Sequence, residues 1–148
     1  EGLLEIGVIL NDNRYLEAAE QAAEKLMRRF EIDGALYGEY DQAWRPSARY
    51  QCVTGSAQMG RVWGRCYEIT GDIRYLNAML KINSALRFTQ APASAPPEIR
   101  GGFPGSIPIY QKYHPNHWPN WAVKFALDSF LIELRLLDQL KGIQHHPV

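Results

Sequence analysis

The sequence predicts an all-α fold made of paired helical hairpins. The first observation is a repeat, because residues 12–18 (DNRYLEA) return as residues 72–78 (DIRYLNA) at an offset of 60 residues (74 − 14). Repeats of this kind are stacked supersecondary units, each of which buries its apolar face on the next. The second observation is a helical period of apolar residues through most of the chain, with no competing alternation typical of strands.

The helix that follows each copy of the repeat is expected to be amphipathic. Asp12 or Asn13, and Asp72, are suited to cap these helices, because short polar side chains accept a hydrogen bond from the first turn. Apolar residues spaced by three or four predict the buried faces. These faces are Tyr15, Ala19, Ala22, Leu26 and Phe30 in the first copy, and Tyr75, Met79, Ile82 and Leu86 in the second.

Two further helices, over 53–70 and about 120–140, are expected on the inside of the hairpins. The first is rich in small residues, including Gly55, Ala57, Gly60 and Gly64, which permit close packing but lower helix propensity. Long loops over 31–51 and 91–119 connect the helices, and loops of this length in compact domains are usually functional or disordered.

The repeat also bears on the two ends of the chain. Residues 3–10 correspond to 63–70, so we expect the chain to begin inside a repeat, as a C-terminal fragment of a larger array would; a short first helix is the alternative. Residues 1–141 are expected to form one domain. Residues 142–148, with His145 and His146, are expected to form a flexible tail.

Composition narrows the class of partner. Sixteen basic and sixteen acidic residues give a formal net charge of zero, which argues against nucleic acid or an anionic membrane as the main partner. No apolar run is long enough to span a bilayer. Cys52 and Cys66 lie 14 residues apart on one expected helix, roughly 21 Å, too far for a disulfide. Reduced cysteines favour the cytoplasm, and we expect no cofactor.

Three motifs resemble those of the α/α-toroid superfamily, which includes squalene-cyclase-like and prenyltransferase-like domains and the six-hairpin sugar-active hydrolases, lyases and epimerases. They are Arg-Tyr-Leu-x-Ala at Arg14 and Arg74, the loop 101–106 (GGFPGS) and the helix start 52–58 (CVTGSAQ). The last two are similar to toroid proteins found with polysaccharide genes. The resemblance implies alternating inner and outer helices in part of a toroid, and a link to polysaccharide metabolism.

The chain departs from three chemistries of that superfamily. It has no Asp-x-Asp-Asp acid motif of squalene cyclases. Cys52 has no neighbouring His to complete the zinc site of protein prenyltransferases, and neither cysteine has the adjacent His of lanthionine cyclases. These activities are therefore disfavoured.

In toroids, ligands usually sit where the inner helices begin, beside the loops. Aromatic rings stack on sugars, and amide and guanidinium groups bind hydroxyls or carboxylates, so an oligosaccharide or uronic acid is the expected ligand. The alternative is that Trp118 and Trp121 cap the core and the asparagines hold turns. The candidate residues are Tyr50, Gln51, Cys52, Arg100, Phe103, Tyr113, His114, Asn116, His117, Trp118, Asn120 and Trp121.

Polar residues also follow one face of the expected helix over 53–70. They either line a central cavity or form a solvated edge with ion pairs. Gln58 and Arg61, nearest the helix start, are the binding candidates. The face contains Gln51, Thr54, Gln58, Arg61, Arg65 and Glu68.

Four residues are candidates for catalysis. His114 and His117 could act as an acid or base near pH 7; a loose zinc site with Cys52 is the alternative, and Pro115 and Pro119 prevent a regular helix there. Tyr113 lies beside them. Asp128 can pair with Lys124, or act as a general acid if it is buried.

We therefore expect a carbohydrate-binding or carbohydrate-processing protein, and, if it is catalytic, a lyase or epimerase rather than a two-carboxylate hydrolase. A non-enzymatic helical-repeat module that binds a protein or forms a homodimer is the alternative, because an open apolar face tends to be covered. An isoprenoid-binding toroid is the third hypothesis.

Overall fold

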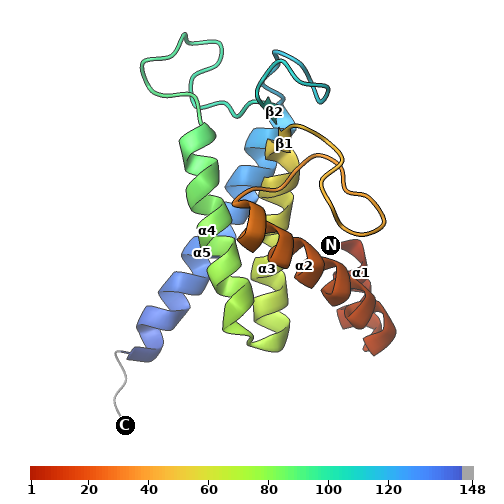
Figure 1. The fold of residues 1–148 in the computed structure, drawn as a ribbon. Helices are drawn as coiled ribbons and strands as arrows, with labels where there is room; N and C mark the ends of the chain where they lie inside the picture. The colour runs from red at the N-terminus through yellow and green to blue at the C-terminus, as the bar shows by residue number, and fades with distance from the viewer. Residues whose placement is uncertain (145–148) are drawn as a thin grey trace.

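The computed structural model of the chain describes residues 1–144 and is mostly helical (Figure 1). These residues form five helices and two strands of two residues each, and the all-α prediction is confirmed. The two strands were not predicted. The elements are α1 (Gly2–Leu10), α2 (Asn13–Asp33), β1 (Gln51–Cys52), α3 (Val53–Thr70), α4 (Ile73–Thr89), β2 (Ser106–Ile107) and α5 (Asn120–Gln144).

Helices α1, α3 and α5 run parallel and in register, and we call them the parallel helices. Arg61 on α3 forms ion pairs with Glu1, at the start of α1, and with Asp128 on α5. These partners lie 60 and 67 residues away along the chain. Ion pairs with the same sequence separations, 60 and 67 residues, recur one and two helical turns further along α3. Arg65 Nε donates to Glu5 at 2.9 Å, and Glu68 pairs with Arg135.

Ion pairs therefore account for half of the polar face predicted on α3. Arg61, Arg65 and Glu68 are all paired with neighbouring helices, whereas Gln58 lies exposed one turn before Arg61. The repeat offset determines these contacts, because equivalent positions on successive parallel helices lie side by side.

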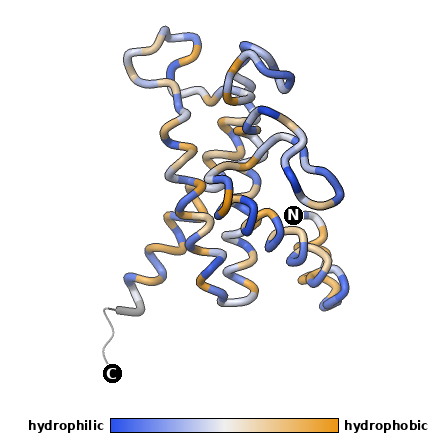
Figure 2. Tube along the Cα trace, viewed as in Figure 1, coloured by the Kyte–Doolittle hydropathy of each residue, from blue (hydrophilic) through white to orange (hydrophobic). Residues whose placement is uncertain are grey.

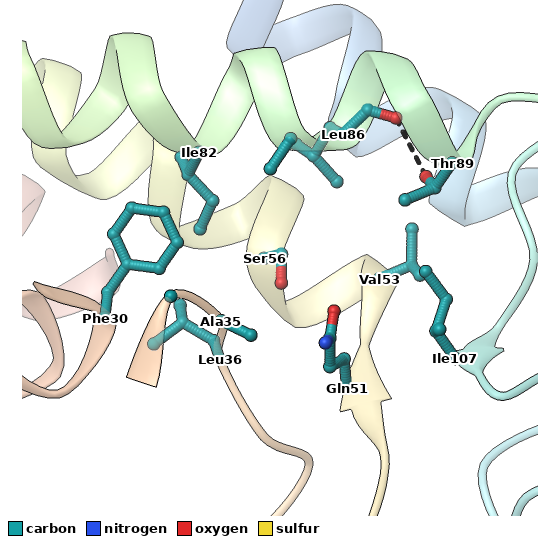
Figure 3. Close-up of a pocket in the computed structure, with 12 residues that line it drawn as sticks. Phe30, Ala35, Leu36, Gln51, Val53, Ser56, Ile82, Leu86, Thr89 and Ile107 are labelled. Carbon is teal, nitrogen blue, oxygen red and sulfur yellow. Dashed lines mark hydrogen bonds between the residues drawn. The ribbon is translucent and has the colours of Figure 1, made fainter. Parts of the chain in front are cut away.

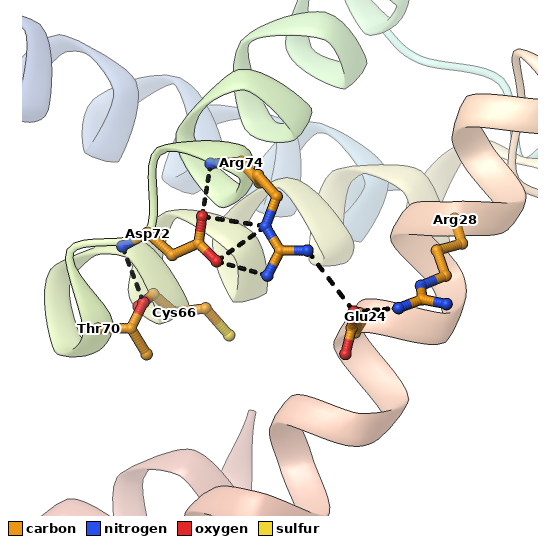
Figure 4. Close-up of polar contacts among 6 residues, drawn as sticks. All are labelled: Glu24, Arg28, Cys66, Thr70, Asp72 and Arg74. Atoms are coloured by element: carbon orange, nitrogen blue, oxygen red, sulfur yellow. Dashed lines mark hydrogen bonds and ion pairs between the residues drawn. The ribbon is translucent and has the colours of Figure 1, made fainter.

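The repeated Asp-x-Arg sequence is a helix start (Figure 4). The Asp72 carboxylate accepts from the Arg74 backbone N–H at 2.9 Å, and the Arg74 guanidinium turns back to the same carboxylate at 2.7 Å. Asp12 and Arg14 repeat this geometry at 3.0 and 2.7 Å. In both pairs the arginine holds the pKa of the aspartate below its usual range. The caps predicted at Asp12 and Asp72 are confirmed.

The predicted apolar faces are confirmed for α4 and partly wrong for α2. All four α4 residues are buried. On α2 the buried residues are Ala23, Met27 and Phe30, whereas Tyr15 is exposed. Tyr75, the equivalent of Tyr15, is buried in the same apolar core as α2. No helix among residues 1–144 covers Tyr15 in the same way.

The core of the array centres on α3. Trp63 is fully buried, donates from Nε1 to the Ala23 carbonyl of α2 at 3.0 Å, and its ring lies 5.6 Å from that of Phe30. On the other side α3 packs closely against α5, because Gly60 leaves room for Ser129 and Gly64 leaves room for Ile132. The small residues of this helix therefore serve close packing, as predicted.

A buried polar network joins α4 to α5. Ser129 Oγ donates to Asn83 Oδ1 at 2.7 Å, and Asn83 Nδ2 donates to Glu133 at 2.8 Å. Arg87 completes it with a hydrogen bond to Glu133 at 3.0 Å. Because Asn83 and Ser129 are fully buried, this network fixes the register of the two helices.

The last helix continues further than the sequence predicted. Helix α5 extends to Gln144, so residues 142–144 of the expected tail are helical. His145 and His146 lie outside the described residues. None of the helices within residues 1–144 combines the length and apolar character that crossing a bilayer requires.

Candidate functional site

The two long loops meet at the end of the array where α3 and α5 begin (Figure 1). β1 and β2 pair antiparallel, with Gln51 opposite Ile107 and Cys52 opposite Ser106. The Val53 N–H then donates to the Gly105 carbonyl at 3.2 Å. Both helix starts and both loops thus border one end of the molecule, where the sequence analysis expected a ligand.

A hollow of about 270 Å³ lies between the first loop, α2 and the start of α3. Its volume is close to the lower end of the range for small-molecule sites. Two tyrosines, an amide and a thiol border an otherwise apolar surface, and none of the lining residues is charged. The hollow is lined by Leu26, Leu36, Tyr37, Gly38, Tyr40, Cys52, Gly55, Gln58 and Met59.

Two of these side chains have defined hydrogen bonds. The Tyr40 hydroxyl accepts from the Tyr37 backbone N–H at 2.9 Å, so its own proton is free to be donated. Cys52 caps α3, and its Sγ accepts from the Gly55 N–H at 3.3 Å. Burial raises the pKa of both Tyr40 and Cys52, so both stay neutral at physiological pH.

Gln58 is the polar side chain best placed to meet a ligand. It is exposed at the edge of the hollow, and no hydrogen bond engages its amide within residues 1–144. An amide offers both donors and an acceptor, which suits a sugar hydroxyl. Arg61, the cation nearest to Gln58 along α3, already forms ion pairs with Glu1 and Asp128.

The start of α5 carries an aromatic cluster formed by Tyr113, His114 and Trp121. The rings of His114 and Trp121 lie 4.8 Å apart edge to face, and those of Tyr113 and His114 lie 4.7 Å apart. Trp121 Nε1 also donates to the Tyr113 hydroxyl at 3.3 Å. Trp121 precedes Asp128 by seven residues, two helical turns, and therefore lies on the side of α5 that faces Arg61.

Asp128 is held by two cations. Its carboxylate contacts Arg61 at 2.7 Å and Lys124 at 2.6 Å, so the predicted pairing with Lys124 is confirmed. The ring of Phe125 lies beneath both cations, and its centroid is 4.5 Å from Lys124 Nζ and 5.7 Å from Arg61 Cζ. The carboxylate thus belongs to the ion pairs between the parallel helices.

The remaining candidates are dispersed. Phe103 is buried in the core, and Trp118 packs on Gly102 with its Nε1 buried and without a hydrogen bond in the described chain. Arg100 is exposed and donates to the Ala95 carbonyl at 3.3 Å.

Three further candidate residues lie in the turns before α5 or at the start of this helix. Asn116 has a left-handed backbone (φ 57°), and Asn120 is the first residue of the helix. His117 Nδ1 lies 2.6 Å from the Pro115 carbonyl, so its ring turns back to its own loop. The left-handed backbone of Asn116 agrees with the alternative to ligand binding, in which the asparagines hold turns.

Gln51 and Tyr50 lie apart from the hollow. Gln51 borders a second, smaller cavity of about 40 Å³ between α2, α3 and α4, enclosed by apolar side chains such as Leu86 and Ile107 (Figure 3). This space admits one or two waters and is too small for a sugar ring. Tyr50 is buried against Gly38, where a Cβ would overlap its ring.

The predicted site is thus divided into parts. Cys52 and Gln58 border the hollow, while Tyr113, His114 and Trp121 form the aromatic cluster on α5. Within residues 1–144, no three His, Cys, Asp or Glu side chains lie close enough together to bind a metal ion.

Sequence reasoning missed Tyr37 and Tyr40. The signal was present, because the first glycine loop (34–38) precedes α3 as the loop 101–105 precedes α5. Gly34 and Gly101 lie at the same offset of 67 residues (101 − 34), and both have a positive φ, 68° and 75°. Of these two equivalent glycine loops only 101–105 was considered for binding, and the candidates from the first long loop were Tyr50 and Gln51 at its end.

Comparisons of the chain with protein-family models, curated proteins and solved structures gave no match.

Proposed function

We propose that this chain is a carbohydrate-binding unit that takes a neutral saccharide in the hollow at the start of α3. The observation that carries the proposal is the lining of that hollow, which combines two tyrosines and a free amide with no charged group. Tyrosine rings pack on the C–H faces of a sugar, and the Gln58 amide and Tyr40 hydroxyl can bind its hydroxyls.

The charges around the hollow favour a neutral ligand over a uronic acid. A uronate needs an available cation, and Arg61, the cation nearest to Gln58 along α3, already neutralises two carboxylates. A uronate would have to compete with these two carboxylates for Arg61, so that each new ion pair would form at the loss of an existing one.

The proposal is for binding rather than catalysis. Of the predicted catalytic residues, Asp128 is held by Lys124 and Arg61, and the His117 ring contacts its own loop. Tyr113 and His114 contact each other and Trp121. The aromatic cluster could extend the binding surface to a second sugar, because an exposed tryptophan offers a stacking face.

The arrangement of helices proposed for this function is part of an α/α toroid. It is supported by the parallel register of α1, α3 and α5, with α2 and α4 returning between them, and by loops that meet at one end. In such an arrangement the hollow lies at the mouth of the toroid.

Isothermal titration calorimetry tests the binding proposal. Neutral gluco-, galacto-, manno- and xylo-oligosaccharides are titrated into the protein at pH 7, beside oligomers of galacturonic and glucuronic acid. We expect saturable binding of at least one neutral series and weaker binding of the uronates. Gln58→Ala should weaken binding about five- to tenfold, because one hydrogen bond contributes about 1 kcal/mol.

Gln139→Ala is the matched control, since Gln139 is also an exposed helical glutamine but lies on the second half of α5. It should leave binding unchanged. Absence of binding by every neutral series to a folded sample would overturn the proposal, and so would equal effects of the two glutamine variants.

A further inference from the structure

The hollow at the start of α3 continues beyond the residues that suit a saccharide. A second cavity, of about 160 Å³, lies between α1, α2 and α3 and shares two lining residues, Leu26 and Met59, with the hollow. The two spaces therefore meet at the same two side chains. We call the second cavity the apolar groove, because alanine, leucine, methionine and valine side chains form most of its lining.

Two rows of side chains, one on α2 and one on α3, border the hollow and the apolar groove. The residues of each row are spaced by four and three positions, so each row lies on one face of its helix. Figure 2 shows polar and apolar residues alternating along α2. From the first to the last residue of the α3 row the path is about 10 Å long, because an α-helix rises 1.5 Å per residue. Starting from the loops, the rows are Leu26, Ala22 and Ala19 on α2, and Gly55, Met59 and Val62 on α3.

The apolar groove offers almost no polar partner to a ligand. Among residues 1–144, Glu1 is the only charged residue in its lining, and the Glu1 carboxylate already pairs with Arg61. Leu26, Met59 and Val62 are partly buried and pack against the main apolar core. A saccharide hydroxyl in this space would give up its hydrogen bonds to water without replacing them, whereas a hydrocarbon chain would gain from leaving water.

The lining of the hollow is divided in the same way. Tyr40 and Gln58 can bind hydroxyls, whereas Leu26 and Leu36 carry no hydrogen-bonding group and Met59 carries only a weak acceptor. Gln58 and Met59 are neighbours on α3, so the polar and apolar parts meet at this point of the helix. The unbranched side chain of methionine adapts readily to an apolar ligand. A molecule with a sugar at one end and a hydrocarbon at the other matches both parts.

We propose that the ligand is an amphiphilic glycoside, a neutral saccharide linked to an unbranched hydrocarbon chain, with the sugar in the hollow and the chain in the apolar groove. This inference rests on the proposed function, because the sugar must occupy the hollow. The shared residues Leu26 and Met59 place a chain attached to that sugar at the entrance of the groove. Neither lining includes a lysine or arginine among residues 1–144, so the linkage between sugar and chain should be uncharged.

Isothermal titration calorimetry with a series of alkyl glycosides tests the inference. The probes are the methyl, butyl, hexyl and octyl glycosides of glucose, galactose, mannose and xylose, each below the concentration at which it forms micelles. For at least one sugar, affinity should rise by up to about fourfold for each methylene group that the groove buries. Gln58→Ala should weaken every member of that series by the same factor, because Gln58 contacts the sugar alone.

Ala22→Leu separates the chain from the sugar, because the larger side chain fills part of the groove. It should remove most of the gain from butyl to octyl and leave the affinity for neutral oligosaccharides unchanged. Ala85→Leu is the matched control, since Ala85 is exposed on α4 and does not line the groove, and it should change neither. Ala18→Glu alters an exposed residue of the groove, so it should fold without repacking and should weaken the longer chains selectively.

The inference and the proposed function fail in different ways. Oligosaccharide binding combined with affinities that do not depend on chain length would overturn the inference and leave the proposed function standing. A gain with chain length that both Ala22→Leu and Ala18→Glu leave unchanged would also overturn the inference, since the chain would then lie elsewhere. Absence of binding by every neutral oligosaccharide and every methyl glycoside would overturn the proposed function, and the inference with it.

Discussion

Tyr15 and Tyr75 show how the environment of one residue type changes between the two repeats. Burial raises the pKa of Tyr75 to about 12. The same cause raises the pKa of the fully buried Cys66 thiol to about 12. Figure 4 shows Cys66 near the end of α3, beside Thr70, together with the contact between Arg74 and Glu24. Both groups must stay protonated in the folded state.

Alkaline stability should therefore depend on Tyr75. The unfolded chain releases the thiol and phenol protons near pH 9 and 10, and the folded chain near 12, so the unfolded state binds fewer protons in between. The free energy of unfolding should fall as pH rises through this window. Tyr75→Phe should make that fall shallower above pH 10, as measured by urea denaturation from pH 8 to 11.5.

Tyr15→Phe is the control for the alkaline series, because it removes the equivalent phenol at an exposed position. Its stability should follow the wild-type curve. If both variants flattened the curve equally, or if neither did, burial of the Tyr75 phenol would not be the cause of the alkaline loss of stability.

At the scale of elements, α3 depends on its small residues. A Cβ at Gly60 would overlap the side chains of Ser129 and Asn83, both of which belong to the buried network between α4 and α5. Neither neighbour can move without breaking a hydrogen bond in a closely packed region. Gly142 also lies in a helix, but a Cβ there meets nothing within 4 Å.

Gly60→Ala should consequently destabilise the protein by about 1–3 kcal/mol, the usual cost of overpacking, despite the higher helix propensity of alanine. Gly142→Ala should be neutral or stabilising by up to about 1 kcal/mol. Denaturant titrations at pH 7 give the free energy of unfolding of each variant and test both expectations. Equal effects of the two substitutions would contradict the packing described for α3.

The helices could be predicted because their signals are local. The range predicted for the helix 53–70 equals α3, which in the structure is capped by Cys52 and ends before Gly71. The strands β1 and β2 were missed because two residues show no period. The buried face of α2 was misplaced at Tyr15 because burial there depends on a neighbouring hairpin rather than on the helix itself.

The contacts between helices required the register of the repeat. Glu1 and Arg61, and Glu5 and Arg65, are oppositely charged at the offset of 60 residues, so the sequence contained the signal for these pairs. The second offset, 67, relates Gly34 to Gly101 in the sequence, but only the structure shows that it also sets the register between α3 and α5. The same is true of the hollow, because its walls come from α2, a loop and α3.

At the scale of the whole molecule, the parallel helices place both long loops at the end where α3 and α5 begin, beside the hollow. The hollow beside Gln58 and the exposed apolar residues of α5 are therefore separate surfaces. Leu131→Glu should leave saccharide affinity intact, because Leu131 is exposed on α5 and does not line the hollow.

The most direct test of the binding proposal is an NMR titration of the ¹⁵N-labelled protein with the neutral oligosaccharide series. Saturable shifts are expected in the amide signals of segments 37–40 and 52–59, which contain most of the residues that line the hollow, with little change along α4. No saturable shift with any neutral sugar, or shifts that leave these two segments unaffected, would contradict it.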